Sequence, residues 1–193
     1  MGLLIPVILG SVRTERQGIK AARYIIRTLT SRGHEPVLVD PKEKQLPLLD
    51  RRYKDYPKGE APPILEELAE LYRGADGFLI VTGEYNNSVP PALKNLLDHF
   101  LEEYYWRPSA IVSYSAGRFS GVRAAVALRT ILAELGMPGV PSVLSIPTIQ
   151  TALTEDGLAK EAWIDGAADR MLTEFEWYAT ALAAKRNSGG TPY

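Results

Sequence analysis

The chain has 193 residues, of which 46% are hydrophobic and 23% are charged, a composition typical of one globular domain with a sizeable core. Its 22 basic and 23 acidic residues leave a net charge of −1, so the composition predicts binding neither to nucleic acid nor to an anionic membrane. The chain contains no cysteine, which excludes disulfides, thiolate nucleophiles, iron–sulfur clusters and cysteine zinc sites.

The first ten residues lack the basic region of a signal peptide and are too short for a membrane span. Pro6 also breaks the pattern required for N-myristoylation. We therefore expect a cytoplasmic protein. Without internal repeats or a linker, residues 1–184 are expected to form one domain, followed by a polar tail at 185–193.

The first predicted strand, residues 3–9, leads into the loop Gly10-Ser11-Val12-Arg13 and then into a helical pattern from Gly18. The free amides and dipole of a helix start favour an anion, and Ser11 and Arg13 add two donors. Val12 stands where a dinucleotide motif needs glycine, and Gly18 precedes isoleucine rather than lysine, so both common nucleotide loops are excluded. A monophosphate site fits; an ordinary polar turn fits this segment equally well.

Further strands are predicted at residues 36–39, 77–82, 110–114 and 142–146. Apolar residues recur at helical spacing within residues 19–29, 93–101, 128–135 and 164–182. Strands that alternate with helices indicate an α/β, doubly wound five-stranded parallel sheet with helices on both faces. Because Pro6 has no amide hydrogen, we expect strand pairing to begin after it.

In such a sheet the ligand lies at the carboxyl ends of the strands, where loops after the first, third and fourth strands converge. The second of these loops runs from Thr82 to Pro91; Ser88 is expected to cap the next helix, and Tyr85 could stack on a flat aromatic ligand. The third loop, residues 115–121, offers hydroxyls and close backbone approach. Plain βα turns are the alternative interpretation of both.

A hydrolase is a weaker interpretation of the segment from Ser113 to Gly117, which resembles a nucleophile elbow. The first glycine of that motif is absent, and both histidines, His34 and His99, precede Ser115. No histidine pair at metal-binding spacing occurs either, so we expect no metal site.

Three ordered blocks resemble the NADPH-dependent FMN reductase family. They are Gly10-Ser11-x-Arg13 with Gly18, then Glu84-Tyr85-Asn86 followed by Leu93-Lys94-Asn95 and Asp98, then Ser115-x-Gly117 with Gly121 and Leu128-Arg129. The resemblance covers about residues 3–146. It implies a flavodoxin-like fold with strand order 2-1-3-4-5, bound FMN, and a homodimer or homotetramer with the flavin near the subunit interface.

The resemblance also implies a role for each matching position. It assigns the FMN phosphate to Ser11, Arg13, Gln17, Gly18 and Ile19. It places Glu84, Tyr85, Asn86 and Ser88 along the isoalloxazine, and Ser115, Gly117 and Arg118 along its other edge. Two positions depart from the family pattern: Gly83 replaces a proline, and Ser120-Gly121 replaces paired glycines.

The activity implied is FMN-dependent oxidation of NADPH or NADH with reduction of a quinone, flavin or related small acceptor, in turn, at one flavin face. A flavodoxin-type electron carrier or a flavin-loaded regulatory module is the alternative. Arg107, Arg118 and Arg123 are equal candidates to recognise the 2′-phosphate of NADPH. The aromatic segment from Tyr104 to Trp106 suits a cavity wall, a subunit contact or the core.

Overall fold

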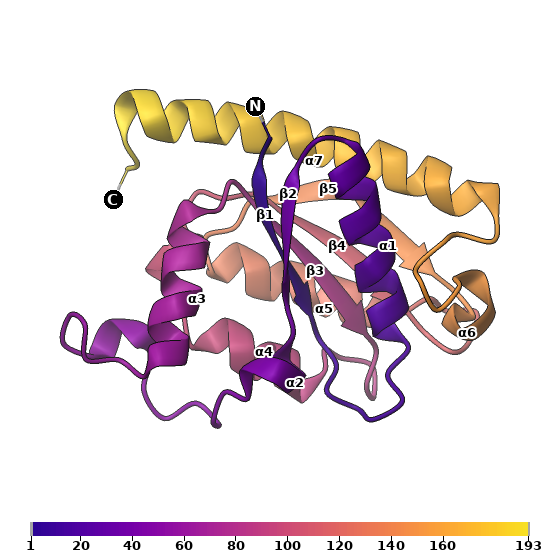
Figure 1. Cartoon of the computed structure of the whole chain (residues 1–193), viewed down its shortest axis with the longest axis horizontal. Helices are drawn as coiled ribbons and strands as arrows, with labels where there is room; N and C mark the ends of the chain where they lie inside the picture. The colour runs from indigo at the N-terminus through magenta and orange to yellow at the C-terminus, as the bar shows by residue number, and fades with distance from the viewer. Residues whose placement is uncertain (1, 193) are drawn as a thin grey trace.

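The computed structural model, which describes residues 2–192, is built on one five-stranded parallel sheet (Figure 1). The strands lie in the order β2-β1-β3-β4-β5, which confirms the predicted flavodoxin-like, doubly wound topology. Their bounds are β1 Leu4–Leu9, β2 Glu35–Val39, β3 Phe78–Gly83, β4 Ser109–Tyr114 and β5 Gly139–Ile146.

Helices cover both faces of the sheet and bury two separate apolar clusters. One face packs against α1 and α7, and the other against α3, α4 and α5. The α-helices are α1 Gly18–Ser31, α2 Pro41–Lys44, α3 Pro63–Gly74, α4 Pro91–Asp98, α5 Val122–Glu134, α6 Ile149–Ala152 and α7 Ala162–Gly189; two 3₁₀ turns are η1 Tyr53–Asp55 and η2 Glu102–Tyr104. No helix among residues 2–192 is long and apolar enough to span a membrane.

The prediction that strand pairing begins after Pro6 holds for only one neighbour of β1. The β1–β3 ladder starts at Val7, whereas the β1–β2 ladder starts at Leu4 and includes Pro6. The backbone of Leu4 faces Asp76, on the β3 side, and alternation turns Pro6 to the same side. The missing amide hydrogen therefore affects pairing with β3 alone.

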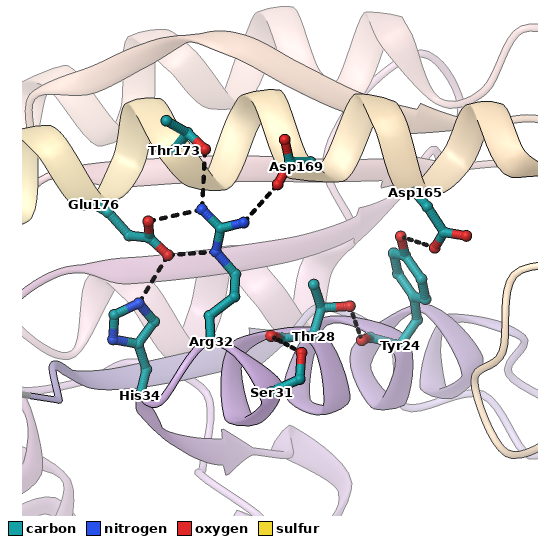
Figure 2. A network of polar contacts seen from close by, with 9 residues as sticks. All are labelled: Tyr24, Thr28, Ser31, Arg32, His34, Asp165, Asp169, Thr173 and Glu176. Carbon is teal, nitrogen blue, oxygen red and sulfur yellow. Dashed lines mark hydrogen bonds and ion pairs between the residues drawn. The ribbon is translucent and has the colours of Figure 1, made fainter.

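A network of hydrogen bonds and ion pairs connects the end of α1 to α7 (Figure 2). The guanidinium of Arg32 donates to the Glu176 carboxylate at 2.5 and 2.7 Å and to Asp169 at 2.6 Å. The ring of His34 contacts the same Glu176 carboxylate at 2.8 Å, and the Tyr24 hydroxyl donates to Asp165 at 2.8 Å. These contacts hold together two helices that are far apart in the sequence.

At the amino ends of the strands the structure corrects one sequence expectation and places Tyr104 in the core, which is one of the three interpretations given for the Tyr104–Trp106 segment. Helix α7 continues through Gly189, so the stretch expected to be a tail from Lys185 begins as helix, and the Arg186 guanidinium donates to the Trp106 carbonyl at 2.8 Å. Tyr104 is fully buried in an aromatic cluster with Tyr72, Phe78 and Phe100. The Tyr104–Trp106 segment precedes β4 and does not line the main cavity, because that cavity lies at the opposite edge of the sheet.

Candidate functional site

A cavity of about 820 Å³ opens at the carboxyl ends of the strands. The loops after β1, β3 and β4 converge on it as predicted, and the segment after β5 contributes a fourth wall. Its lining residues are Ser11, Arg13, Thr14, Glu15, Arg16, Gln17, Gly83, Glu84, Tyr85, Tyr114, Ser115, Ala116, Ile149 and Gln150.

The structure brings half of the predicted site residues to this cavity. Those that line it are Ser11, Arg13, Gln17, Glu84, Tyr85 and Ser115. The others do not line it, although each belongs to one of the three loops or to the first turn of α1; they are Gly18, Ile19, Asn86, Ser88, Gly117 and Arg118.

A buried ion pair holds the loop after β1 in place. Arg16 pairs with the carboxylate of Asp40, which is 1% exposed, and also donates to the Ser11 carbonyl at 2.9 Å. The same carboxylate accepts the Lys42 amide at 2.9 Å and so caps α2. Arg16 therefore holds the loop to the end of β2, whereas Arg13 is exposed, with its guanidinium 5.9 Å from the Tyr85 ring.

The start of α1 has the properties of an anion site. Its N-cap, Gln17, makes no side-chain cap, and the first turn holds no acidic residue. The side-chain oxygen of Gln17 is buried without a hydrogen-bond partner, and reversing the amide would turn a donor there instead. At Gly10 an added Cβ would approach Leu93 and the Val81 carbonyl to 3.1–3.2 Å, so the loop lies close against β3 and α4.

The loop after β3 contains a tight turn at Asn86 and Asn87, in agreement with the alternative interpretation of this segment as a turn. Tyr85 and Ser88 exchange backbone hydrogen bonds of 3.0 Å, while Asn86 and Asn87 adopt φ values of 50° and 65°. Asparagine tolerates this left-handed backbone better than most residues. Ser88 is therefore not the helix cap that we expected; Pro90 occupies the N-cap position of α4.

Glu84 turns its carboxylate toward α5 instead of the open cavity. One oxygen accepts the backbone amide of Arg123 at 3.1 Å, and the other pairs with the Arg123 guanidinium at 2.5 Å. The side chain of Glu84 is only 9% exposed and lies at the positive end of the α5 dipole. This contact joins the loop after β3 to the helix that follows β4.

Two tyrosines connect the walls of the cavity. The hydroxyl of Tyr85 lies 2.9 Å from the Ser11 hydroxyl, so this ring is held to the first loop. Tyr114, at the end of β4, packs its ring against Gly18 and Gly83. An added Cβ at Gly18 would lie 2.2 Å from the Tyr114 hydroxyl, and one at Gly83 would lie 3.1 Å from it.

The loop after β4 contains one departure from the family pattern, Ser120, and its contacts remove the hydrolase interpretation. Ser120 adopts a φ of 57°, the left-handed conformation that a glycine would accept without strain. The Ser115 hydroxyl donates to the Gly117 carbonyl at 2.7 Å. His34 is bound to Glu176, and His99 is buried against Pro47; neither lines the cavity with Ser115.

Sequence reasoning missed several cavity residues. Arg16 and Thr14 lie in the loop already singled out, but Asp40, which fixes Arg16, comes from another strand end. Tyr114 was visible as the last residue of a predicted strand, although only the fold turns it toward Gly18. Ile149 and Gln150 follow β5, where no motif marks them. Among residues 2–192 no cluster of three or more potential metal ligands occurs.

Known proteins share this sequence pattern and fold. The family model of NADPH-dependent FMN reductases matches residues 3–151. A quinone reductase from Pseudomonas putida is 35% identical over 140 residues, 69% of this chain and 72% of that protein.

Two solved structures show the breadth of the fold. FerB, a flavoenzyme NAD(P)H:(acceptor) oxidoreductase from Paracoccus denitrificans, has a TM-score of 0.72 at 21% identity, covering 91% of this chain and 98% of that one. A flavodoxin variant from Pseudomonas aeruginosa has a TM-score of 0.55 at 19% identity, covering 87% and 98%. The fold thus serves both enzymes and flavodoxins, whereas the sequence match is specific: the chain belongs to the NADPH-dependent FMN reductase family.

Proposed function

We propose that this FMN-dependent NAD(P)H oxidoreductase passes electrons to a quinone, a flavin or a related small acceptor. One observation supports the proposal most strongly. The start of α1, which has no side-chain cap, and the loops after β3 and β4 lie around one cavity of about 820 Å³. A quinone acceptor is supported by the 35% identity to the Pseudomonas putida quinone reductase.

The residues present fit FMN. The amides at the start of α1, the Ser11 hydroxyl and the exposed Arg13 guanidinium form a donor set suited to a phosphate, with Gln17, Gly18 and Ile19 in the same turn. The buried, unpartnered side-chain oxygen of Gln17 marks a polar group that protein contacts leave unsatisfied. We assign this end of the cavity to the phosphate.

The other loops are proposed to border the isoalloxazine. Gly83, Glu84 and Tyr85 line one wall, and Ser115 and Ala116 line another. Since the Glu84 carboxylate is occupied by Arg123, Glu84 would approach the ring through its backbone. Asn86, Ser88, Gly117 and Arg118 stand farther out on the same loops and would border the ring at the rim.

When bound, FMN supplies the hydride chemistry, accepting from NAD(P)H and giving to the acceptor. The chain needs no nucleophile or metal for this. Its residues would hold the phosphate, fix the loops through Arg16 and Glu84, and line one cavity that nicotinamide and acceptor would enter in turn. We therefore propose a ping-pong order of reaction.

Anaerobic stopped-flow spectroscopy tests this proposal. NAD(P)H alone should bleach the bound flavin at a rate at least equal to turnover, because reduction does not require the acceptor. Reduction that needs the acceptor or a protein partner would contradict the ping-pong scheme. Turnover absent without a partner reductase would instead favour the electron-carrier alternative.

We also propose a cytoplasmic homo-oligomer, either a dimer or a tetramer. Three large apolar side chains, Phe119, Val122 and Val126, are 58%, 42% and 68% exposed on the third loop and the first turns of α5. They lie beside a loop that lines the cavity, where a second subunit would shield them from water. This strip replaces the Tyr104–Trp106 segment as the candidate contact.

A further inference from the structure

We infer that the hydroxyl of Tyr114 donates a hydrogen bond to the phosphate of the bound flavin, which makes Tyr114 a residue that selects FMN over riboflavin. The inference rests on the proposed function. It adds a residue from the end of β4 to a subsite that sequence motifs place on the loop after β1.

The position of the hydroxyl is defined by the glycine that faces it. Gly18 is the first residue of α1, and a Cβ there would lie 2.2 Å from the Tyr114 hydroxyl oxygen and 2.6 Å from its ring carbon Cζ. The hydroxyl therefore reaches the first turn of α1, whose amides form the proposed phosphate site. Tyr114 also lines the cavity itself.

The glycine has a cost that this contact explains. Glycine loses more conformational freedom on folding than any other residue. Alanine at position 18 cannot coexist with Tyr114 in its present place, because no Cβ fits within 2.2 Å of an oxygen. Because Gly18 has no side chain, the Tyr114 hydroxyl can lie next to the start of α1.

Gly83 contributes the same kind of space from the other side. A Cβ at position 83 would lie 3.1 Å from both Cζ and the hydroxyl of Tyr114, closer than most real contacts of this type. This position is where the family pattern has proline. The absence of a side chain here gives the ring room between β3 and α1.

The environment of Tyr114 keeps its hydroxyl in the neutral form, which can donate a hydrogen bond to an anion. The residue is 7% exposed, and its burial raises its pKa to about 12. Hydrogen bonding with the Ser11 side chain and the nearby guanidiniums of Arg16 and Arg13 lower this pKa but do not cancel the effect of burial. The hydroxyl stays protonated at neutral pH, where it faces an anion as a neutral donor.

The test compares FMN with riboflavin, which lacks the phosphate, in fluorescence titrations of the apoprotein. Tyr114→Phe removes only the hydroxyl, so we expect FMN affinity to fall about tenfold or more, as for loss of a charge-assisted hydrogen bond. Riboflavin affinity should change less than twofold. Tyr72→Phe is the matched control, since it removes a buried hydroxyl from the opposite face of the sheet.

Each result decides the inference. An equal loss of FMN and riboflavin in Tyr114→Phe would show that the hydroxyl serves the fold, and unchanged FMN affinity would show that it does not reach the phosphate; either overturns the inference. An equal FMN loss in Tyr72→Phe would overturn it as well. These outcomes leave the proposed function intact, whereas a parent protein that fails to bind FMN would overturn both.

Discussion

At the scale of single residues, the arginines that could bind a phosphate differ in the partners that their guanidinium groups already contact. Arg16 is paired with Asp40 and Arg123 with Glu84, so both charges serve to position loops. Arg107 lies at the other end of the sheet and donates to the carbonyls of Ala75, Tyr105 and Arg73. Of the three candidates for a 2′-phosphate, the structure thus favours Arg118, which is exposed on the third loop.

Arg13→Ala should weaken FMN binding about ten- to hundredfold, because it removes a charge-assisted contact worth about 1.5–3 kcal/mol. Riboflavin affinity should hardly change, since riboflavin has no phosphate. Isothermal or fluorescence titration of both flavins measures the difference. Arg51→Ala, which removes an arginine that stacks on Tyr56 away from the cavity, is the control and should affect neither flavin. A parallel loss of both flavins in Arg13→Ala would assign Arg13 to the fold.

The place of Ser11 and Arg13 at the cavity could be predicted from sequence because the relevant signals are local. Ser11 and Arg13 follow a strand and precede a helix within one short segment, and both line the cavity. The fixation of that segment could not be predicted, since the Arg16–Asp40 pair joins residues from two different strand ends. The motif also could not predict which way the Glu84 carboxylate points, because that direction depends on where α5 begins.

At the scale of elements, hydrophobic periodicity predicted the strands and the sheet order followed from the resemblance. Helix α3 was not among the predicted periodic segments, although Leu65, Leu68 and Tyr72 bury one face of it. The end of α7 was placed too early, because its last turns carry polar residues from Lys185 onward and are held by tertiary contacts such as that of Arg186 with Trp106. Composition alone does not reveal such contacts.

Because the Glu176 carboxylate connects α1 to α7 (Figure 2), the free energy of unfolding should depend on pH through the ionisation of Glu176. Hydrogen bonding from Arg32 lowers the pKa of Glu176 in the folded protein, and His34 acts in the same direction. A carboxyl group with a lowered folded pKa stabilises the protein above its unfolded pKa of about 4.3 and loses this effect as the pH falls through the folded pKa.

Glu176→Gln should therefore lower the free energy of unfolding at pH 7 and have a smaller effect at pH 3. Urea denaturation at the two pH values measures both differences. Glu70→Gln, on the exposed side of α3, is the control and should have little effect at either pH. A difference for Glu176→Gln that is the same at pH 7 and pH 3 would contradict the argument, because it would not depend on the charge.

At the scale of the whole molecule, the cavity and the main aromatic cluster lie at opposite edges of the sheet. The carboxyl ends of the strands hold the cavity and the residues assigned to the flavin. The amino ends hold the Tyr72–Tyr104 aromatic cluster and the contacts of Arg107 and Arg186, and His34 at the start of β2 joins the α7 network. Changes at the amino edge should thus affect unfolding more than flavin affinity, unless they disturb the proposed assembly of subunits.

If Phe119, Val122 and Val126 pack against a second copy of the chain, Val126→Arg would bury a charge in an apolar contact and shift the protein to monomers at micromolar concentration. Trp177→Arg is the matched control, since Trp177 is 69% exposed on α7, compared with 68% for Val126. Sedimentation velocity should show an oligomer for the parent protein and the control.

A parent protein that sediments as a fully active monomer would refute the proposed assembly, and an oligomer that survives Val126→Arg would place the contact elsewhere. Because the strip adjoins the third loop, loss of the oligomer should also weaken FMN binding, which the same titrations detect.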